Sequence, residues 1–171
     1  MSIINTLSYR VAKNVDLSVI VEIYNSIIDE KELTADLSRF TVKDKRSWFL
    51  SHSATPYQLY VVERSATIVG YFYFSPWRSG REALGGTAEV SYYLQKESRR
   101  KGIGRYILQQ AIRIARENGL INLLAILLDI NIPSMKLLES EGFVIVGRIP
   151  NIAVINDKVC GQLLMIKPLI A

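Results

Sequence analysis

The chain has 171 residues, of which 49% are hydrophobic and 22% are charged, and its formal net charge is +5. That length favours a single domain with its own hydrophobic core, and the composition is typical of a globular protein rather than a disordered or fibrous chain. The basic residues are scattered except between positions 99 and 105, and no stripe of cations alternates with aromatic residues. Nucleic acid is therefore disfavoured as a partner.

Rare residue types narrow the chemistry further. Cys160 is the only cysteine and His52 the only histidine. A single cysteine excludes an internal disulfide. The two counts together disfavour a zinc site of the Cys/His type. They also disfavour a Ser-His-Asp triad, unless it used His52. We predict no metal. The N-terminus lacks a charged segment followed by an apolar core, and the apolar run at 120–128 is too short to span a bilayer. We expect a cytoplasmic protein with no membrane partner.

The first half of the chain predicts three strands and two helices. Two segments with apolar residues at helical spacing follow Asp16 and Thr41, residue types that favour helix N-caps. The polar stretch between them, residues 30–40, is expected to connect the helices or to wall a substrate site. The predicted elements are a strand at 7–12, helices at 17–29 and 42–52, strands at 58–63 and 68–74 joined by a hairpin around 65–67, and an irregular connection at 75–86.

The second half predicts a strand at Thr87–Leu94, a long helix after the basic turn, and a helix stop at Asn118 and Gly119. Further on come a buried strand at 123–128 and a short helix from about Pro133 to Glu141, which Gly142 ends. Two last strands, 144–148 and 158–166, are separated by a loop that contains Pro150, Asn156 and Asp157. This order predicts a mixed α/β sheet with helices on its faces.

Four cations, Arg99, Arg100, Lys101 and Arg105, lie at or near the predicted start of the long helix. A helix N-terminus carries partial positive charge and unpaired N–H groups, so an anion would relieve the conflict there. Gly102 and Gly104 would let its oxygens approach the backbone. A surface loop with several arginines remains the alternative. A dinucleotide fold is less convincing without an opening strand–helix unit and an acidic partner, and no Gly-Lys-Ser/Thr follows for a P-loop.

Glu89 stands inside a predicted strand, where Thr87, Glu89, Ser91 and Tyr93 share one face. A carboxylate there needs a partner or a wet cleft. It is either a salt-bridged or exposed residue, or a general base that acts directly or through water. Asn131 follows the buried strand, where it caps the next helix or binds a cofactor at the strand edge.

Together these features resemble the GNAT-type N-acetyltransferase superfamily over nearly the whole chain. Its acyl-CoA signature, Q/R-x-x-G-x-G/A, is matched by Arg99, Gly102 and Gly104, and its later signature, an Asn followed by a helix ending in Gly-Phe, by Asn131 and Gly142-Phe143. Further stretches are similar to its phosphinothricin N-acetyltransferase branch. They are Ile23-Tyr24-Asn25-Ser26, Leu33-Thr34-Ala35-Asp36, Trp48-Phe49, Pro76-Trp77-Arg78, Thr87-Ala88-Glu89 and Arg148-Ile149-Pro150.

The resemblance implies a single-domain GNAT-like α/β fold over residues 1–171, with its core at about 8–168. About seven strands in a mixed, mostly antiparallel sheet would be flanked by about four helices. It also implies an acetyl-CoA-dependent transfer to the amino group of a small amino-acid-like compound, such as phosphinothricin, methionine sulfoximine or methionine sulfone. Glu89 would be the general base, the amine would attack the thioester directly, and the branch suggests a homodimer with substrate sites near the interface.

Individual roles follow from the same resemblance. Substrate contacts would come from Arg78, Glu89, Val90 and Ser91. The pyrophosphate would lie on the basic turn, the pantetheine arm on the strand before it, and the rest of the cofactor near the last helix. The residues implied for the pyrophosphate are Arg99, Arg100, Lys101, Gly102, Ile103, Gly104 and Arg105. Those implied for the pantetheine arm are Tyr92, Tyr93 and Leu94, and those implied for the rest of the cofactor are Asn131 and Ser140.

Two positions depart from the family pattern. Leu138 stands seven residues after Asn131, where many members have a tyrosine and branch members a histidine, so a side-chain general acid is absent there. Water, another tyrosine such as Tyr93, or no acid at all could serve. Cys160-Gly161 occupies positions that are often polar or acidic in the branch. Two alternatives therefore remain. The protein could acetylate a protein N-terminus, a polyamine or an aminoglycoside, or it could be a non-catalytic CoA-binding sensor.

Overall fold

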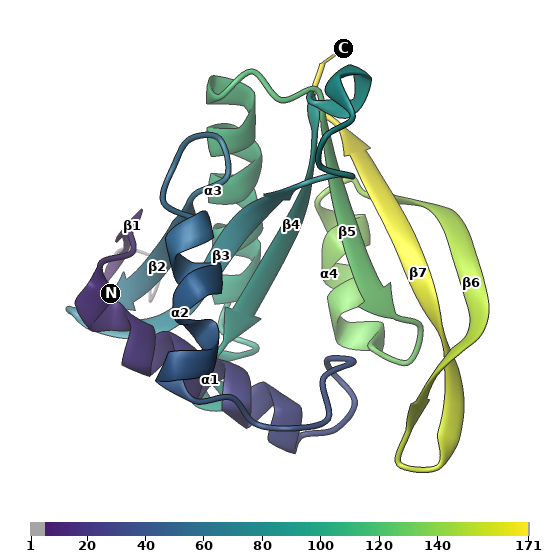
Figure 1. Ribbon diagram of the computed structural model, residues 1–171, viewed down its shortest axis with the longest axis horizontal. Coiled ribbons are helices and arrows are strands. Elements are labelled where there is room, and N and C mark those ends of the chain that lie inside the picture. The colour runs from purple at the N-terminus through teal and green to yellow at the C-terminus, as the bar shows by residue number, and fades with distance from the viewer. Residues whose placement is uncertain (1–5, 171) are drawn as a thin grey trace.

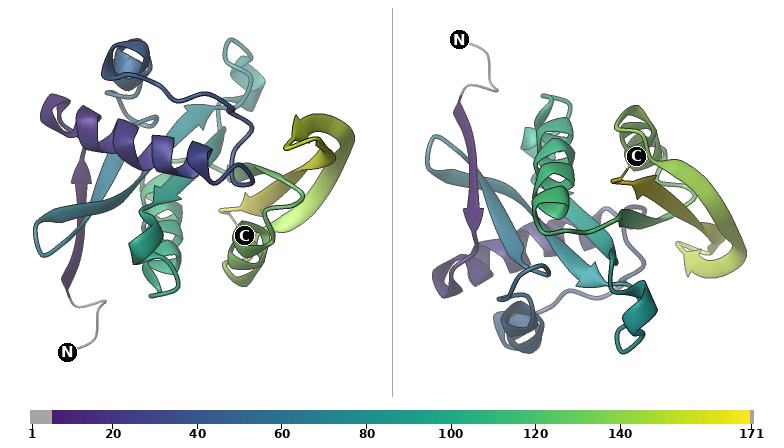
Figure 2. Two further views of the ribbon diagram at one scale, coloured as in Figure 1. Left: turned by 90° about the horizontal axis from the view of Figure 1, so that it is seen from below. Right: turned by 90° about the horizontal axis from the view of Figure 1, so that it is seen from above.

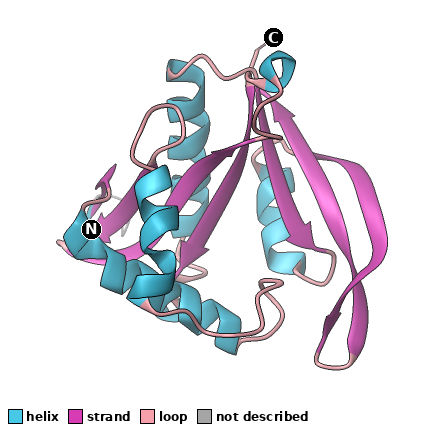
Figure 3. Ribbon diagram, in the orientation of Figure 1, coloured by secondary structure: helices cyan, strands magenta, loops and turns pink. Residues whose placement is uncertain are grey.

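The computed structural model describes residues 6–170, and the sheet in this part of the chain has seven strands (Figures 1 and 3). The elements in chain order are β1 (Leu7–Val11), α1 (Leu17–Asp29), α2 (Val42–Ser51), β2 (Leu59–Arg64), β3 (Thr67–Pro76), β4 (Thr87–Leu94), α3 (Ile103–Glu117), β5 (Asn122–Leu128), α4 (Ile132–Ser140), β6 (Val144–Ile155) and β7 (Lys158–Pro168). The predicted fold class, a mixed and mostly antiparallel α/β sheet flanked by helices, is confirmed.

The strands lie in the order β1-β2-β3-β4-β5-β7-β6, and every neighbouring pair is antiparallel except β4 and β5. Helices α1 and α2 cover one face of the sheet, and α3 and α4 cover the other (Figure 2). One apolar core therefore lies between the sheet and α3, around Phe72, Ile107 and Leu123, and a second lies beneath α1, around Ile20 and Tyr71.

The one parallel pair is also the shortest contact between central strands. Thr87, Ala88 and Glu89 of β4 pair with residues 122–124 of β5, and the pairing stops there. Both strands continue beyond that point, and they diverge as they run away from the chain's C-terminal end (Figure 1). Backbone N–H and C=O groups on this edge of β4 beyond Glu89 thus have no β5 partner.

The ends of the helices and strands lie within one or two residues of the predicted ends, apart from those of the last hairpin and the end of β3. The loop predicted around Pro150 is wrong, because β6 continues through it to Ile155. Proline is tolerated because β6 is the edge strand and its pairing with β7 is irregular between Ile149 and Ala153. The turn is confined to Asn156 and Asp157, which both have positive φ, as a two-residue hairpin loop requires.

Two local predictions also change. Residues 75 and 76 belong to β3 instead of the following connection, so Ser75 pairs with Glu89 of β4. Asp16 precedes α1 but its side chain does not cap that helix. Its carboxylate instead binds Arg10, with N–O distances of 2.7 and 3.0 Å, and accepts from the Lys13 backbone N–H. Thr41 does cap α2, through the Asp44 backbone N–H.

Candidate active site

Glu89 lies where β4 and β5 part. It is the last β4 residue that pairs with β5, and opposite it on β3 stands Ser75. Within residues 6–170 its half-buried carboxylate has no hydrogen-bond or ion-pair partner, and burial raises its pKa above the ordinary value of a glutamate. A carboxylate that is partly desolvated and unpaired is poised to accept a proton from a bound molecule.

Side chains of β4 alternate between the two cores, as its sequence predicts. Ala88 and Val90 are buried in the core with α3, whereas Tyr93 packs in the core beneath α1. Glu89 and Ser91 therefore face the α1 and α2 side. Val90 has its side chain on the opposite face, so only its backbone lies beside Glu89.

An aromatic cluster adjoins Glu89 on this face. Tyr93 meets Tyr24 of α1 edge to face, with ring centroids 5.0 Å apart, and lies 5.1 Å from Tyr71 of β3. Tyr73, whose pKa is raised by burial and by the Glu89 charge, contacts Trp48 of α2 at 5.1 Å. Burial also raises the pKa of Tyr24 and of Tyr93, so these hydroxyls stay neutral near pH 7.

The segment between α1 and α2 is fastened over this cluster. Asn25 of α1 holds Phe40 through two hydrogen bonds of 2.8 Å to its backbone, and Tyr24 donates to Asp36. The ammonium of Lys45 lies 3.9 Å from the centroid of the Phe40 ring. The segment 30–40 is thus tied to α1 on the Glu89 face of the sheet. Arg78 is exposed in the connection between β3 and β4.

The basic turn places a backbone suited to an anion at the start of α3. Gly102 is the N-cap, with φ +80° and ψ −5°, a conformation that glycine adopts without steric cost. Ile103 is fully buried, so it offers only its backbone to a ligand. Gly104 packs closely against α4, because a Cβ atom added to it would lie 2.8 Å from the Leu137 side chain.

Two of the four cations of the basic turn have acidic partners in the described chain. Arg99 makes a bidentate ion pair of 2.7 and 2.8 Å with Glu30 at the end of α1. Arg105 pairs with Glu141 after α4 at 2.9 Å. The sequence could not reveal these partners, because they come from distant elements. Lys101 donates to the Glu97 carbonyl, and Arg100 has no side-chain partner in the described chain.

The remaining predicted positions lie along α4. Asn131 accepts from the Ser134 backbone N–H at 3.3 Å, so it caps the helix as one of its two interpretations predicts. Tyr92 reaches across from β4, and its hydroxyl lies 2.6 Å from that of Ser134, while burial raises its pKa to about 12. Ser140 donates to Leu137, and Leu138 is buried in the core.

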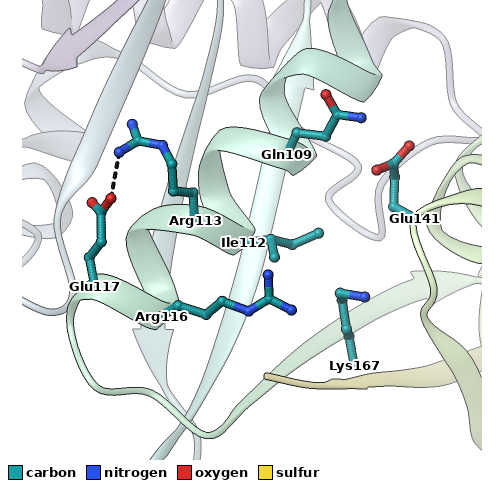
Figure 4. A pocket seen from close by; sticks show the side chains of 7 residues that line it. All are labelled: Gln109, Ile112, Arg113, Arg116, Glu117, Glu141 and Lys167. Carbon is teal, nitrogen blue, oxygen red and sulfur yellow. Dashed lines mark hydrogen bonds and ion pairs between the residues drawn. The ribbon is translucent and has the colours of Figure 1, made fainter. Parts of the chain in front are cut away.

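A hollow of about 380 Å³ lies on the other face of the sheet from Glu89, beside α3 (Figure 4). Its lining consists of Gln109, Ile112, Arg113, Arg116, Glu117, Glu141 and Lys167. Arg113 is engaged by Glu117 at 2.6 Å. None of the predicted site residues lines this hollow, so it is separate from the Glu89 site. Among residues 6–170, no three His, Cys, Asp or Glu side chains gather as a metal site, and no helix is long and apolar enough to cross a membrane.

Comparison with known proteins decides the family. The model of the acetyltransferase (GNAT) family matches residues 20–143, more than two thirds of the chain. The chain belongs to this family. It is an acyltransferase, with acetyl-CoA as the acetyl donor of the GNAT family. The geometry fits this donor, because β4 has an unpaired backbone edge beyond Glu89 and the α3 N-terminus has a left-handed glycine at its cap.

Several individual relatives and solved structures are similar to most of the chain. A Bacillus subtilis protein, provisionally named phosphinothricin acetyltransferase YwnH, is 39% identical over 89% of this chain and 93% of its own. The L-methionine sulfoximine/L-methionine sulfone acetyltransferase of Pseudomonas aeruginosa is 30% identical over 85% and 84%. The solved structure of yncA from Salmonella typhimurium with acetyl-CoA has a TM-score of 0.89, 26% identity, and coverage of 97% and 95%.

The sequence alone does not reveal one set of neighbours of Glu89. His52 is the C-cap of α2, and its Nε2 lies 3.1 Å from the Ser75 hydroxyl. Ser75 belongs to β3 and stands opposite Glu89, whereas the sequence predicts that it lies in a connection. The only available signals were the uniqueness of His52 and the alternation of Tyr71, Tyr73 and Ser75 along one strand face.

Proposed function

We propose that this protein transfers the acetyl group of acetyl-CoA to the amino group of a small amino-acid-like compound. The candidate acceptors belong to the phosphinothricin, methionine sulfoximine and methionine sulfone class, which the names of the relatives suggest. The observation that carries the proposal is Glu89, a half-buried carboxylate without a partner in the described chain, at the point where the central strands part. The proposed domain is the whole chain, 1–171, and the proposed location remains the cytoplasm.

The proposed donor site joins the open edge of β4 to the start of α3. Backbone groups of Tyr92, Tyr93 and Leu94 would hold the pantetheine arm, and the amides of 100–105 would hold the pyrophosphate. Arg100 and Lys101 supply cationic side chains, while Arg99 and Arg105 shape the turn through their ion pairs. Asn131 and Ser140 would contact the cofactor further along α4.

Glu89 is the proposed general base. An amine is mostly protonated at neutral pH, so its lone pair becomes available only when a base removes the proton. Glu89 takes that proton through a bound water molecule, and the raised pKa that burial gives it brings its basicity closer to neutral pH. Bound acetyl-CoA supplies the thioester carbonyl that the free amine attacks. N–H groups of residues 92–94 donate hydrogen bonds where negative charge develops.

The acceptor is proposed to be held from two sides. The Arg78 guanidinium, exposed near the β3 end, can pair with a substrate carboxylate in bidentate fashion. Ser91 and the backbone of Val90 lie next to Glu89 on β4. Leu138 is 1% exposed in the core and provides no acid for the departing thiol. A thiolate is a tolerable leaving group, so the mechanism needs no side-chain acid there.

An amine panel tests this proposal. Purified protein with acetyl-CoA should release free thiol most rapidly with methionine sulfone, methionine sulfoximine or phosphinothricin, and more slowly with polyamines, aminoglycosides or peptide N-termini. The measurement is thiol release under saturating donor, with mass spectrometry of the acetylated product. A preference for a peptide, polyamine or aminoglycoside would overturn the substrate class. Donor binding without thiol release for any amine would favour a CoA-binding sensor.

The predicted homodimer remains a proposal, and the edge strand β6 supports it. Val144, Val146 and Val154 are 55%, 58% and 59% exposed on this twelve-residue strand. The only charged residue of β6 is Arg148, and it forms an ion pair of 2.5 Å with Asp129. Long apolar edge strands without free charges pair with another chain. We propose that a second copy of this protein covers this surface.

Val154→Lys is expected to weaken the dimer, because a lysine in an apolar interface must be desolvated without a partner. Sedimentation velocity should show the wild type at twice the monomer mass and V154K shifted toward the monomer at the same concentration. Val15→Lys is the matched control, because Val15 is 80% exposed near α1, far along the sheet from β6. A monomeric wild type, or equal dimerisation of wild type and V154K, would contradict this placement.

A further inference from the structure

His52 and Ser75 form a hydrogen-bond chain that ends beside Glu89. The Nδ1 atom of His52 lies 2.7 Å from the carbonyl oxygen of Trp48, and its Nε2 atom lies 3.1 Å from the Ser75 hydroxyl. Ser75 stands directly opposite Glu89 in the antiparallel pairing of β3 and β4. Side chains of such a pair lie on the same face of a sheet, with Cβ atoms roughly 5 Å apart.

The direction of each hydrogen bond in this chain is fixed by chemistry. A carbonyl oxygen can only accept, so His52 must carry its proton on Nδ1 and donate it to Trp48. The Ser51 hydroxyl donates to the same carbonyl at 2.7 Å, so its oxygen, which lies 3.1 Å from Nδ1, also presents lone pairs to the Nδ1 proton. Burial lowers the pKa of His52, which therefore stays neutral near pH 7. Its bare Nε2 then accepts the Ser75 proton.

Ser75 consequently cannot use its proton for Glu89. With that proton directed to His52, its oxygen presents only lone pairs, and Glu89 is the opposite residue on that face. Lone pairs on the Ser75 oxygen repel a charged carboxylate, but they can accept a hydrogen bond from a protonated carboxyl group. The arrangement thus stabilises the form of Glu89 that exists after it has taken a proton.

We propose that His52 and Ser75 are positioning residues that increase the basicity of Glu89. This inference rests on the proposed role of Glu89 and deepens it. No bond to the substrate is made by either residue. His52 orients the Ser75 hydroxyl, and Ser75 in turn accepts from the Glu89 carboxyl once the amine proton has moved there.

Other titratable groups around these residues are accounted for. Tyr73 of β3 adjoins His52, with ring centroids 4.9 Å apart, and feels the Glu89 charge. Tyr93 of β4 and Tyr24 of α1 complete the cluster, and burial keeps all three hydroxyls neutral. The ammonium of Lys45 of α2 lies over the rings of Phe40, Tyr24 and Trp48, 3.9, 4.7 and 5.5 Å from their centroids. The facing β5 residue, Leu124, is apolar.

The test is the pKa of the Glu89 carboxyl, measured by NMR on protein with labelled glutamate and assigned with Glu89→Gln. Ser75→Ala removes the acceptor and should lower this pKa by about 0.5 to 1 unit. His52→Phe keeps the ring but frees the Ser75 proton to donate to the carboxylate, so its shift should be at least as large. The double variant should match S75A, because His52 acts only through Ser75.

Controls separate this role from a structural one. Ser75→Thr keeps the hydroxyl and should retain the wild-type pKa, and Ser53→Ala removes an exposed hydroxyl outside the chain of hydrogen bonds. The only histidine allows the tautomer to be read directly from nitrogen chemical shifts, with Nδ1–H expected. An Nε2–H tautomer, or an unchanged Glu89 pKa in S75A and H52F, would overturn the proposal.

Kinetics separate this inference from the proposed function. In an active enzyme, the acid limb of the pH profile for kcat/KM should move to lower pH in S75A and H52F by the same shift that NMR records. A uniform loss at all pH values with an unmoved limb would indicate only a structural role. An inactive wild type that still shows the NMR shifts would contradict the proposed acetylation and leave the coupling of His52, Ser75 and Glu89 intact.

Discussion

Replacing Glu89 with glutamine is expected to lower kcat by about 10²- to 10⁴-fold, the usual contribution of a general base. Glutamine keeps the shape of the side chain but cannot accept a proton from the amine. The dissociation constant of acetyl-CoA should stay within about twofold of the wild type, because the proposed donor contacts lie on 92–94 and on the basic turn. Steady-state kinetics and calorimetric titration measure the two quantities.

The role of Glu89 as a base also predicts how activity depends on pH. Glu89 works as the carboxylate, and burial raises its pKa, so wild-type activity should fall as the pH drops through that raised value. The residual activity of E89Q should lack this acid limb. Glu117→Gln is the matched control, since Glu117 pairs with Arg113 on the other face of the sheet. Wild-type turnover in E89Q at every pH would remove Glu89 from the mechanism.

Replacing Gly102 with valine is expected to weaken acetyl-CoA binding about 5- to 30-fold. Gly102 has φ +80° at the cap of α3, and a β-branched residue in the left-handed region costs roughly 1–2 kcal/mol. The turn can relieve that strain only by rotating the amides that are proposed to hold the pyrophosphate. Calorimetric titration with acetyl-CoA measures the loss.

A second glycine separates lost binding from lost stability. Gly119, just past the end of α3, has φ +74° and open space around its Cβ position. Gly119→Val should therefore lower the melting temperature about as much as Gly102→Val, without changing acetyl-CoA affinity. Equal affinity losses in both variants would indicate a general effect on the fold and contradict a donor site at the turn.

Much of the fold was predictable from local patterns. Helical spacing located α1 and α3, strand alternation placed Glu89 and Tyr93 on one face of β4, and Asn131 caps α4 as its position suggested. These features depend on residues within one or two turns of each other, so periodicity and capping chemistry record them. The departures, at Pro150 and at the end of β3, fall where strand pairing extends an element beyond its local signal.

By itself, the sequence determined the strand–turn–helix around Gly102, the carboxylate at position 89 and the absence of a polar side chain at Leu138. Only the tertiary structure decided which groups meet. It gave Arg99 and Arg105 acidic partners just past the ends of α1 and α4, and it placed Ser75, which is bonded to His52, opposite Glu89. The reason is physical. Local spacing fixes the direction of a side chain along its own element, whereas its partner depends on how distant elements pack and pair, and that register is not written at either position alone.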